Sequence, residues 1–417
     1  MMKTTAIRIY GKSDLRLEEF ELPPMGEDEI LAKIVTSSIC MSDHKAVLQG
    51  IAHKRIPNDV AENPIILGHE FCGELIKIGT KWEHKYNVGQ KFTLQTALNK
   101  NNSMDAPGYS FPYIGGNSTY VIIPNDVMEL NCLLPYSGDA FFSGSMAEPY
   151  SCIIGSFHAN YHTKRGSYEY DMGIIEGGNL ALIGGAGPMG IGAVDYLIHR
   201  ERKPGLIVVT DIDDTRLHVA SQLITIEEAA KNGIKLIYMN SSSSDELMAL
   251  TNGLGYDDVF VYVPVAAAIE LADDILGRDG CLNFFAGPTD PTFKAPFNFY
   301  NVHYASTHIV GTTGGNTSDM IEALTMMGKN QLSPATMISH IGGIDSAIDA
   351  ILNLNTLPGG KKLLYTHISM PLTAIDEFEN MDDPIFSTLG EIVKKSNGLW
   401  SLEAEKYLLE HGKAITV

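Results

Sequence analysis

The sequence predicts an α/β protein in which a mostly antiparallel β domain is joined to a domain built on a doubly wound parallel sheet. Up to about Tyr150, short alternating runs are broken by Gly, Pro and Asn clusters. From about Ile153 to Gly311, apolar runs alternate with helical stretches, as parallel strands joined by crossover helices require. The chain has 417 residues, enough for two or three domains that each bury a core.

The first predicted domain spans residues 1–152. Its expected strands lie in "EILAKIVTSSI", "FCGELIKIG" and "STYVIIP", and the first residues alternate like an edge strand. The second spans residues 153–311. Its expected strands lie in "NLALIGG", "LIVVTDID" and "DDVFVYVP", and its helices in "PMGIGAVDYLIHRE", "TRLHVASQL" and "AAAIELADDIL".

We expect residues 312–370, with a helix in "DMIEALTMMGKN", to return to the first domain, and residues 371–417 to form a helical C-terminal extension. Capping chemistry places two helices in this extension. One begins at Asp383 and Pro384 and the other at Ser401, while Gly398 and Gly412 are placed to end them.

Composition narrows the classes of function. The hydrophobic content of 44% and charged content of 19% are those of a globular protein, and a net charge of −20 argues against binding nucleic acid. Five scattered cysteines do not form a disulfide framework, which favours a reducing cytoplasm. Since no signal peptide and no apolar run of about 18 residues is found, we expect neither export nor a membrane span.

A glycine-rich turn is the first chemical motif. Gly185, Gly187 and Gly190 have the G-x-G-x-x-G spacing, with Pro188 and Met189 between them, directly after an apolar strand and at the start of a helix. In this context the glycines allow a tight turn, close approach of a pyrophosphate and close helix packing. The alternative is a purely structural turn, or a site for another nucleotide.

Asp211 supports a dinucleotide. It ends the next strand, 21 residues after Gly190, where a carboxylate accepts hydrogen bonds from the adenosine ribose and repels a 2′-phosphate. This favours NAD(H), although Arg216, five residues further on, leaves NADP(H) open. In "GGKKLLY", Lys362 and its neighbour Lys361 are candidates for the coenzyme pyrophosphate.

Four residues of the first domain offer donor atoms that zinc prefers, namely Cys40, His69, Glu70 and Glu148. Three of them have a structural alternative when taken alone: Cys40 a buried thiol, His69 a core histidine and Glu148 the cap of a helix. Cys72, close to His69 in the sequence, is expected to be a small buried packing residue.

Together these motifs resemble the medium-chain alcohol dehydrogenases. "GHEFCGELIKIG" fits their zinc signature, "CMSD" their C-x-[ST]-D element, and "AEPYSC" the segment that brings the third ligand in the sorbitol dehydrogenase branch. "GGAGPMG" and "VVTDIDDTRL" are similar to the coenzyme fingerprint of that branch. The resemblance covers about 370 residues and implies a GroES-like catalytic domain and a Rossmann coenzyme domain.

The resemblance implies one catalytic zinc per chain, with Glu70 as a fourth or alternating ligand beside three others, Cys40, His69 and Glu148. Ser42 matches the hydroxyl that passes the substrate proton toward solvent. Asp43 matches the carboxylate that orients the ligating histidine. Zinc bound to a substrate oxygen then favours alkoxide formation while the nicotinamide takes the hydride.

Two departures from the family pattern matter. The stretch that holds four cysteines and a second zinc in many relatives contains none here, so we expect a single metal. Lys45 occupies the position of their relay histidine, and His44 lies one place earlier. Whether His44 transfers protons or is a solvated loop histidine is left open.

The tail after Met370 is a third departure, and it resembles the extension of the L-sorbose-1-phosphate reductases, which interconvert L-sorbose 1-phosphate and D-glucitol 6-phosphate. Such a substrate needs a phosphate site. His53, Lys54 and Arg55 lie together in one loop, where Lys54 and Arg55 suit a phosphate dianion. The alternative is a solvated basic loop.

We therefore expect a cytoplasmic, zinc-dependent, NAD(P)-linked oxidoreductase that interconverts a polyol phosphate and its ketose phosphate. Two alternatives are an unphosphorylated polyol or L-threonine dehydrogenase, and a non-catalytic nucleotide-binding protein. The expected partner is a small-molecule substrate, and the resemblance implies a homo-oligomer, either a dimer or a tetramer.

Overall fold

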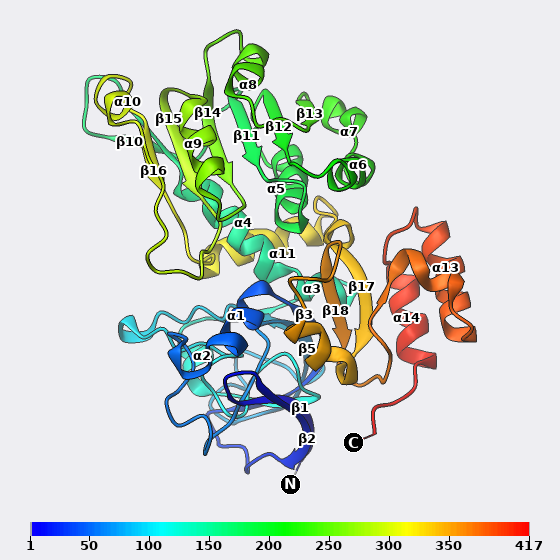
Figure 1. The fold of residues 1–417 in the computed structure, drawn as a ribbon. Coiled ribbons are helices and arrows are strands. Elements are labelled where there is room, and N and C mark those ends of the chain that lie inside the picture. The colour runs from blue at the N-terminus through cyan, green and yellow to red at the C-terminus, as the bar shows by residue number, and fades with distance from the viewer. Residues whose placement is uncertain (1, 417) are drawn as a thin grey trace. The chain divides into compact units, whose positions relative to one another are not determined.

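The computed structural model describes residues 2–416, which divide into two compact units. Among these residues, unit 1 comprises 2–149 and 337–416, and unit 2 comprises Tyr150–Thr336. The chain therefore leaves unit 1, builds unit 2 and returns (Figure 1). In the part of the chain that the structure describes, no helix is long and apolar enough to cross a membrane.

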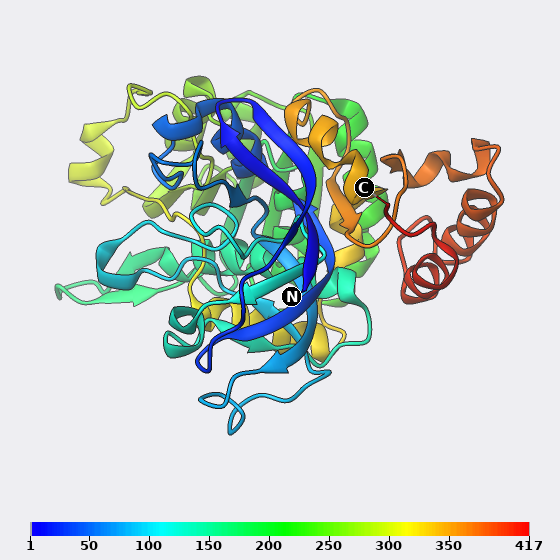
Figure 2. The same ribbon diagram turned by 90° about the horizontal axis from the view of Figure 1, so that it is seen from below.

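Unit 1 is built on a largely antiparallel sheet whose strands follow the order β19-β17-β18-β3-β5-β6-β8, with β7 also paired to β3. The bounds are β3 (Ile30–Ile39), β5 (Glu70–Ile78), β6 (Lys91–Leu94), β7 (Tyr120–Ile123), β8 (Leu133–Pro135), β17 (Ile338–Gly343), β18 (Lys361–Tyr365) and β19 (Thr373–Ala374). A smaller sheet contains β1 (Lys3–Gly11), β2 (Asp14–Glu21) and β4 (Ile65–Ile66), and Figure 2 shows the long blue strands β1 and β2 side by side.

The register of this sheet brings three strand ends together. Ser38 pairs with Glu70 on β5, and Ile39 pairs with Lys362 on β18. The end of β3, the start of β5 and the start of β18 therefore meet at one edge. Four short helices of unit 1 accompany the sheets in the described residues: α1 (Met41–Gln49), α2 (Asn125–Glu129), α3 (Phe141–Ser145) and α12 (Ala347–Leu352). The longer α4 (Ala147–Ala159) starts in unit 1 and continues into unit 2.

Unit 2 contains a six-stranded parallel sheet in the order β13-β12-β11-β14-β15-β16. Its strands are β11 (Asn179–Ile183), β12 (Leu206–Thr210), β13 (Lys235–Met239), β14 (Tyr256–Val261), β15 (Leu276–Phe284) and β16 (His308–Val310). The helices are α5 (Pro188–His199), α6 (Asp214–Leu223), α7 (Ile226–Lys231), α8 (Ser244–Leu250), α9 (Ala266–Asp274), α10 (Phe299–Tyr304) and α11 (Thr317–Gly328). The chain reverses direction along the sheet between β11 and β14, the point where doubly wound folds bind ligands.

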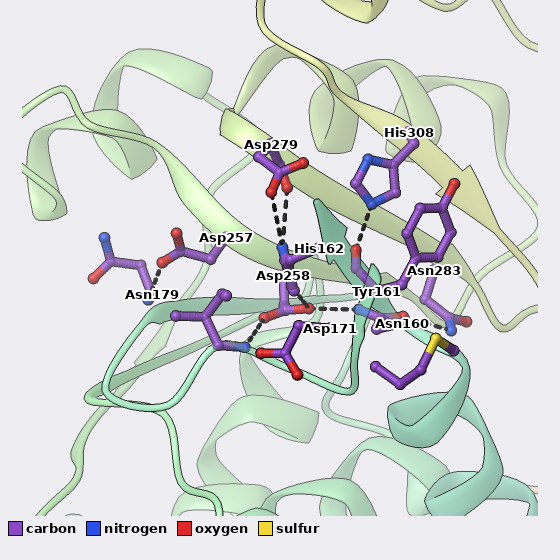
Figure 3. A network of polar contacts seen from close by, with 12 residues as sticks. Asn160, Tyr161, His162, Asp171, Asn179, Asp257, Asp258, Asp279, Asn283 and His308 are labelled. Carbon is purple, nitrogen blue, oxygen red and sulfur yellow. Dashed lines mark hydrogen bonds and ion pairs between the residues drawn. The ribbon is translucent and has the colours of Figure 1, made fainter. Parts of the chain in front are cut away.

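A small hairpin of β9 (Tyr161–Thr163) and β10 (Tyr170–Met172), which the sequence patterns did not indicate, is tied to this sheet by polar contacts (Figure 3). His162 lies with Nε2 3.2 Å from Asp258 Oδ1 and Nδ1 3.0 Å from the carbonyl of Asp279. Burial alone would lower the pKa of His162, but Asp258 and Asp279 raise it. Because both ring nitrogens face acceptors, the doubly protonated ring satisfies both contacts.

The C-terminal extension folds as predicted into two helices, α13 (Pro384–Lys395) and α14 (Leu402–His411), after the 3₁₀ helix η5 (Ile375–Asn380). Asp383 and Ser401 cap them through their side chains, and Gly412 follows the last residue of α14. In Figures 1 and 2 the two helices, orange to red, lie together at one side of unit 1. The extension is thus an ordered part of unit 1.

The fold class predicted from the sequence is confirmed. A mostly antiparallel β unit and a parallel α/β unit are both present, and the expected strands and helices appear at the expected runs. One domain boundary differs from the expectation that residues 312–370 return to the first domain. The helix in "DMIEALTMMGKN" is α11 and belongs to unit 2. The chain rejoins unit 1 at Met337.

Candidate metal and coenzyme sites

The candidate metal site lies in unit 1, at the edge where β3, β5 and β18 meet. Cys40 follows β3 and is the N-cap residue of α1. Its backbone N–H donates to Asp43 Oδ2 over 3.1 Å, while Asp43 Oδ1 lies 2.9 Å from Nδ1 of His69. One fully buried carboxylate therefore fixes both the backbone of Cys40 and the ring of His69.

Gly68 turns the chain so that two adjacent side chains reach the same place. Its φ of +100° favours glycine, and a Cβ there would come within 2.8 Å of Asn117 Cγ. Donor atoms of Cys40, His69 and Glu70 lie within 4.8 Å of one another. Glu148 Oε2 is 4.0 Å from His69 Nε2, the ring nitrogen that faces away from Asp43.

A buried ion pair borders this cluster. Lys361 Nζ donates to Glu70 Oε1 over 2.5 Å, whereas Glu70 Oε2 is buried without a hydrogen-bond partner. Burial alone would lower the pKa of Lys361, but the negative charge of Glu70 and Cys40 raises it. The thiolate, imidazole and carboxylate donors, and the unpartnered oxygen of Glu70, fit a zinc ion.

Charge also affects His69. Burial lowers its pKa, but Asp43 raises it more, and the pKa lies well above the ordinary value. A carboxylate on Nδ1 is the arrangement that orients a metal-binding imidazole and fixes its tautomer. Ser42 lies beside these groups, with Oγ 3.1 Å from Cys40 Sγ and 3.5 Å from His69 Nε2.

Tyr109 belongs to this site, although the sequence patterns did not indicate it. Its side chain is fully buried, and its hydroxyl donates to Ser42 Oγ over 2.8 Å and lies 2.8 Å from His69 Nδ1. Burial and the neighbouring Asp43 raise its pKa well above 10. The phenol therefore stays protonated and remains a donor to Ser42.

The basic loop predicted for phosphate lies against the same tyrosine. The guanidinium of Arg55 is 5.2 Å from the centre of the Tyr109 ring, and the ring of His53 stacks on it at 5.9 Å. Arg55 is half-buried and its Nε has no hydrogen-bond partner, whereas Lys54 is exposed. Burial, Arg55 and Lys54 lower the pKa of His53 to about 4, so this ring is neutral near pH 7.

Two neighbouring residues differ in environment. Cys72 is fully buried on β5, in keeping with the predicted packing role, and burial raises the pKa of its thiol. His44 is also buried, on α1, with Nδ1 2.7 Å from the carbonyl of Ile351. The alternative of a solvated loop histidine is therefore wrong, because the residue lies in a helix that packs against α12.

The candidate coenzyme site is the turn between β11 and α5 in unit 2. A Cβ on Gly190 would lie 2.0 Å from the carbonyl oxygen of Gly185, so the helix and turn approach too closely for any side chain. A Cβ on Gly187, the N-cap residue of α5, would meet no atom within 4 Å. Pro188 and Met189 form the first turn of the helix. The turn thus has the open space and the free helix N-terminus that a pyrophosphate requires.

Asp211 follows β12 and lies beside this turn. Its Oδ2 accepts from the N–H of Ala186 over 3.4 Å, and it is largely buried. Arg216 lies on α6 with an exposed side chain. Lys362, by contrast, is buried in unit 1 and donates to the carbonyls of Pro358 and Gly360. Burial lowers its pKa to about 8.

Comparison with known proteins supports the family. Residues 26–131 match the alcohol dehydrogenase GroES-like domain, and residues 188–329 match the zinc-binding dehydrogenase domain. The chain is 49% identical to L-sorbose 1-phosphate reductase of Klebsiella pneumoniae over 416 residues, which covers 100% of both chains. It is 50% identical to mannitol-1-phosphate 5-dehydrogenase of Aliivibrio fischeri over 416 residues, or 98% of each.

The fold is also similar to a solved structure. The 2R,3R-butanediol dehydrogenase of Bacillus subtilis superposes with a TM-score of 0.70 at 20% identity, over 87% of this chain and 99% of that one. The two relatives that are about 50% identical to this chain over nearly its whole length, together with the matches to both domain models, identify the family. The chain belongs to the zinc-dependent medium-chain alcohol dehydrogenases, enzymes that use a nicotinamide coenzyme.

Proposed function

We propose that this chain is a zinc-dependent, NAD(P)-linked oxidoreductase that interconverts a polyol phosphate and its ketose phosphate, of the L-sorbose 1-phosphate and D-glucitol 6-phosphate type. The observation that carries the proposal is the arrangement around Tyr109. One face of its ring meets the guanidinium of Arg55, while its hydroxyl reaches Ser42 beside the metal ligands. A single substrate could thus present a carbinol to the metal and a phosphate to Arg55.

When bound, zinc supplies a Lewis acid for the substrate oxygen and the nicotinamide exchanges a hydride with the carbinol carbon. Glu70 would be a fourth or alternating ligand beside the three that hold the metal, Cys40, His69 and Glu148. Asp43 keeps the ring of His69 in place. Ser42 would accept the proton of the substrate hydroxyl while passing its own proton on toward solvent, and Tyr109 orients Ser42 by donating to its oxygen.

For the coenzyme, the turn Gly185–Gly190 would hold the pyrophosphate, and Asp211 would accept hydrogen bonds from the adenosine ribose. We propose NAD(H) as the preferred coenzyme, because the carboxylate of Asp211 repels a 2′-phosphate. The exposed Arg216 is the residue that could accept NADP(H) instead. Lys362 remains a proposed pyrophosphate contact, although its amine is bonded to backbone carbonyls of its own loop.

The names of two relatives support a phosphorylated substrate. Two proteins at about 50% identity are named for L-sorbose 1-phosphate and mannitol 1-phosphate. A guanidinium and an ammonium in one loop match a phosphate dianion. We also propose a cytoplasmic location and a homo-oligomer, either a dimer or a tetramer, which light scattering of the purified protein would test.

A coenzyme assay tests the substrate class. Oxidation of NADH and NADPH is followed with L-sorbose 1-phosphate, fructose 6-phosphate and the free ketoses, with and without a chelator. We expect rapid turnover of the phosphorylated ketoses, only slow turnover of the free ketoses, and loss of both after chelation. Equal turnover of free and phosphorylated ketoses would favour an unphosphorylated polyol dehydrogenase. NADH binding without zinc or turnover would favour a non-catalytic nucleotide-binding protein.

The Arg55→Ala variant tests the phosphate contact. Loss of a hydrogen-bonded charge costs about 1.5–3 kcal/mol, so kcat/KM for the phosphorylated ketose should fall about tenfold to a hundredfold. Residual activity on a free ketose should not change. The matched control is Arg16→Ala, which removes an exposed guanidinium paired with Asp14 on β2. Unchanged kinetics of Arg55→Ala would exclude this phosphate site.

A further inference from the structure

One carboxylate of the C-terminal extension is buried in unit 1. Glu405 of α14 is 1% exposed, and its two oxygens accept three hydrogen bonds. The backbone N–H of Phe141 donates to Oε1 over 2.7 Å, and that of Phe142 donates to Oε2 over 2.8 Å. The hydroxyl of Tyr365 donates to Oε2 over 2.9 Å. A buried carboxylate is costly without such partners, so these bonds fix its place.

The two amides belong to the first turn of α3. The N-cap residue of this helix, Ala140, has no side chain to accept from them. Glu405 supplies the missing acceptor from 264 positions away in the sequence. The extension therefore performs the capping that the local sequence of α3 lacks.

Helix α3 is held closely along its length. Ser145 Oγ lies 2.6 Å from Thr36 Oγ1 on β3, and a Cβ on Gly144 would lie 2.4 Å from Cys72 Sγ on β5. Glu148 follows Ser145 by three residues, at the start of α4. The position of α3 therefore sets where Glu148 enters the candidate metal site.

The third hydrogen bond of Glu405, from Tyr365, connects it to the candidate metal site through strand β18. Tyr365 lies on β18, and Lys361 lies four residues earlier on that strand, so their side chains point to the same face. Lys361 holds Glu70. The hydroxyl of Tyr365 also accepts from the indole N–H of Trp400, a second residue of the extension, over 2.7 Å.

We propose that Glu405 is a positioning residue for the zinc site, acting through α3 on Glu148 and through β18 on Lys361 and Glu70. The C-terminal extension then helps to hold the metal ligands in position, although it supplies no ligand itself. This inference rests on the proposed zinc ligands. It adds to them a determinant of metal affinity that touches neither metal nor substrate.

The test measures metal affinity rather than activity. Zinc affinity of the folded full-length protein is measured by competition with a chromophoric chelator, and the ligand field by the absorption spectrum of the cobalt-substituted protein. Removing a side chain that hydrogen-bonds a metal ligand directly weakens metal binding about tenfold to a hundredfold, and since Glu405 acts further from the ligands we expect the lower end, about tenfold. We expect Glu405→Gln to weaken zinc binding by this factor and to alter the cobalt spectrum, because its amide places a donor against the amides of α3.

The matched control is Leu389→Ala, which opens a cavity at a fully buried position of α13 in the same extension, a helix that packs mainly on η5 and α14. It should lower the unfolding midpoint and leave zinc affinity and the cobalt spectrum unchanged. If Glu405→Gln does not fold, Glu405→Asp replaces it, since the shorter side chain cannot span both amides.

The outcomes separate this proposal from the one on which it rests. Zinc affinity of Glu405→Gln equal to that of the wild type would overturn the positioning role alone. Equal weakening in Leu389→Ala would also overturn it, because general loosening of the extension would then be sufficient. A wild-type protein that binds no zinc would overturn both proposals.

Discussion

At the scale of single residues, the environment of Ser42 departs from that expected of its family. The position of the usual relay histidine is occupied by Lys45, and His44 is bonded to a backbone carbonyl. The described hydrogen bond to the Ser42 hydroxyl oxygen comes from Tyr109, a residue 67 positions away. If Ser42 accepts the substrate proton as proposed, Tyr109 is therefore the residue that orients its hydroxyl.

The Tyr109→Phe variant tests this role. It removes one hydroxyl and keeps the ring under Arg55, and a lost hydrogen bond of about 0.5–1.5 kcal/mol predicts that kcat falls about twofold to tenfold. Steady-state kinetics should show no further loss when Tyr109→Phe is added to Ser42→Ala. Equal losses in both backgrounds would mean that the two hydroxyls act independently.

The sequence patterns did not indicate Tyr109, and they indicated Lys361 only as a coenzyme contact, whereas in the structure Lys361 pairs with Glu70. Cys40, His69 and Gly190 lie in motifs whose spacing is local. Tyr109 and Lys361 reach the site only because strands distant in the sequence meet at one edge of a sheet. A tyrosine in a loop and a lysine on a strand have no distinctive spacing, so only the fold reveals their partners.

At the scale of elements, the turn between β11 and α5 separates packing from binding. We predict that Gly190→Ala destabilises the protein by about 1–3 kcal/mol, because its Cβ would overlap the carbonyl of Gly185. Gly187→Ala should leave stability unchanged, since its Cβ meets no protein atom and φ is −84°. Its NADH affinity should nevertheless fall at least about tenfold, or about 1.4 kcal/mol.

Urea unfolding and NADH fluorescence measure the two effects separately. Each variant is the control of the other, because both add one methyl group within the same turn. Unchanged NADH affinity in Gly187→Ala would show that the pyrophosphate does not approach this glycine.

The elements themselves were largely predictable, and the exceptions have physical causes. Strands β3, β5 and β11 coincide with apolar runs of the sequence. Asp383 and Ser401 are typical N-cap residues and indicate where α13 and α14 begin. The hairpin β9–β10 was missed because its strands of three residues are mostly polar or exposed, and it is held by buried contacts such as Asn160 with Asp258. The hairpin is therefore stabilised by its contacts with the parallel sheet rather than by its own sequence.

At the scale of the whole molecule, the pH dependence of stability should be set partly by histidines with carboxylate partners in unit 2. The pKa of His158 is raised to about 9, first by hydrogen bonds to Asp319 and Glu322. Asp258 and Asp195 likewise raise the pKa values of His162 and His199. A histidine whose pKa is raised on folding contributes its full stability below its unfolded pKa of 6.5 and loses it as the pH rises through the folded value.

We therefore predict that the free energy of unfolding falls between about pH 6.5 and pH 9. The change from His158 alone should be small, because its side chain is 43% exposed and solvent screens the pair. Urea unfolding is measured across this pH range. For His158→Gln, the free energy of unfolding should fall less steeply with pH than it does for the wild type. The exposed His218→Gln on α6 is the control, and an unchanged slope in both variants would contradict the prediction.

The order in which the two units occur along the chain affects how the enzyme is made. Unit 2 is synthesised in full before residue 337 leaves the ribosome, whereas β3 still lacks β18 and Glu70 still lacks Lys361. At about 5–20 residues per second, the remaining segment takes several seconds to appear. During that interval the sheet edge that carries Cys40 and His69 lacks β18, so the candidate metal site takes its final form only after residues 361–365 have been made.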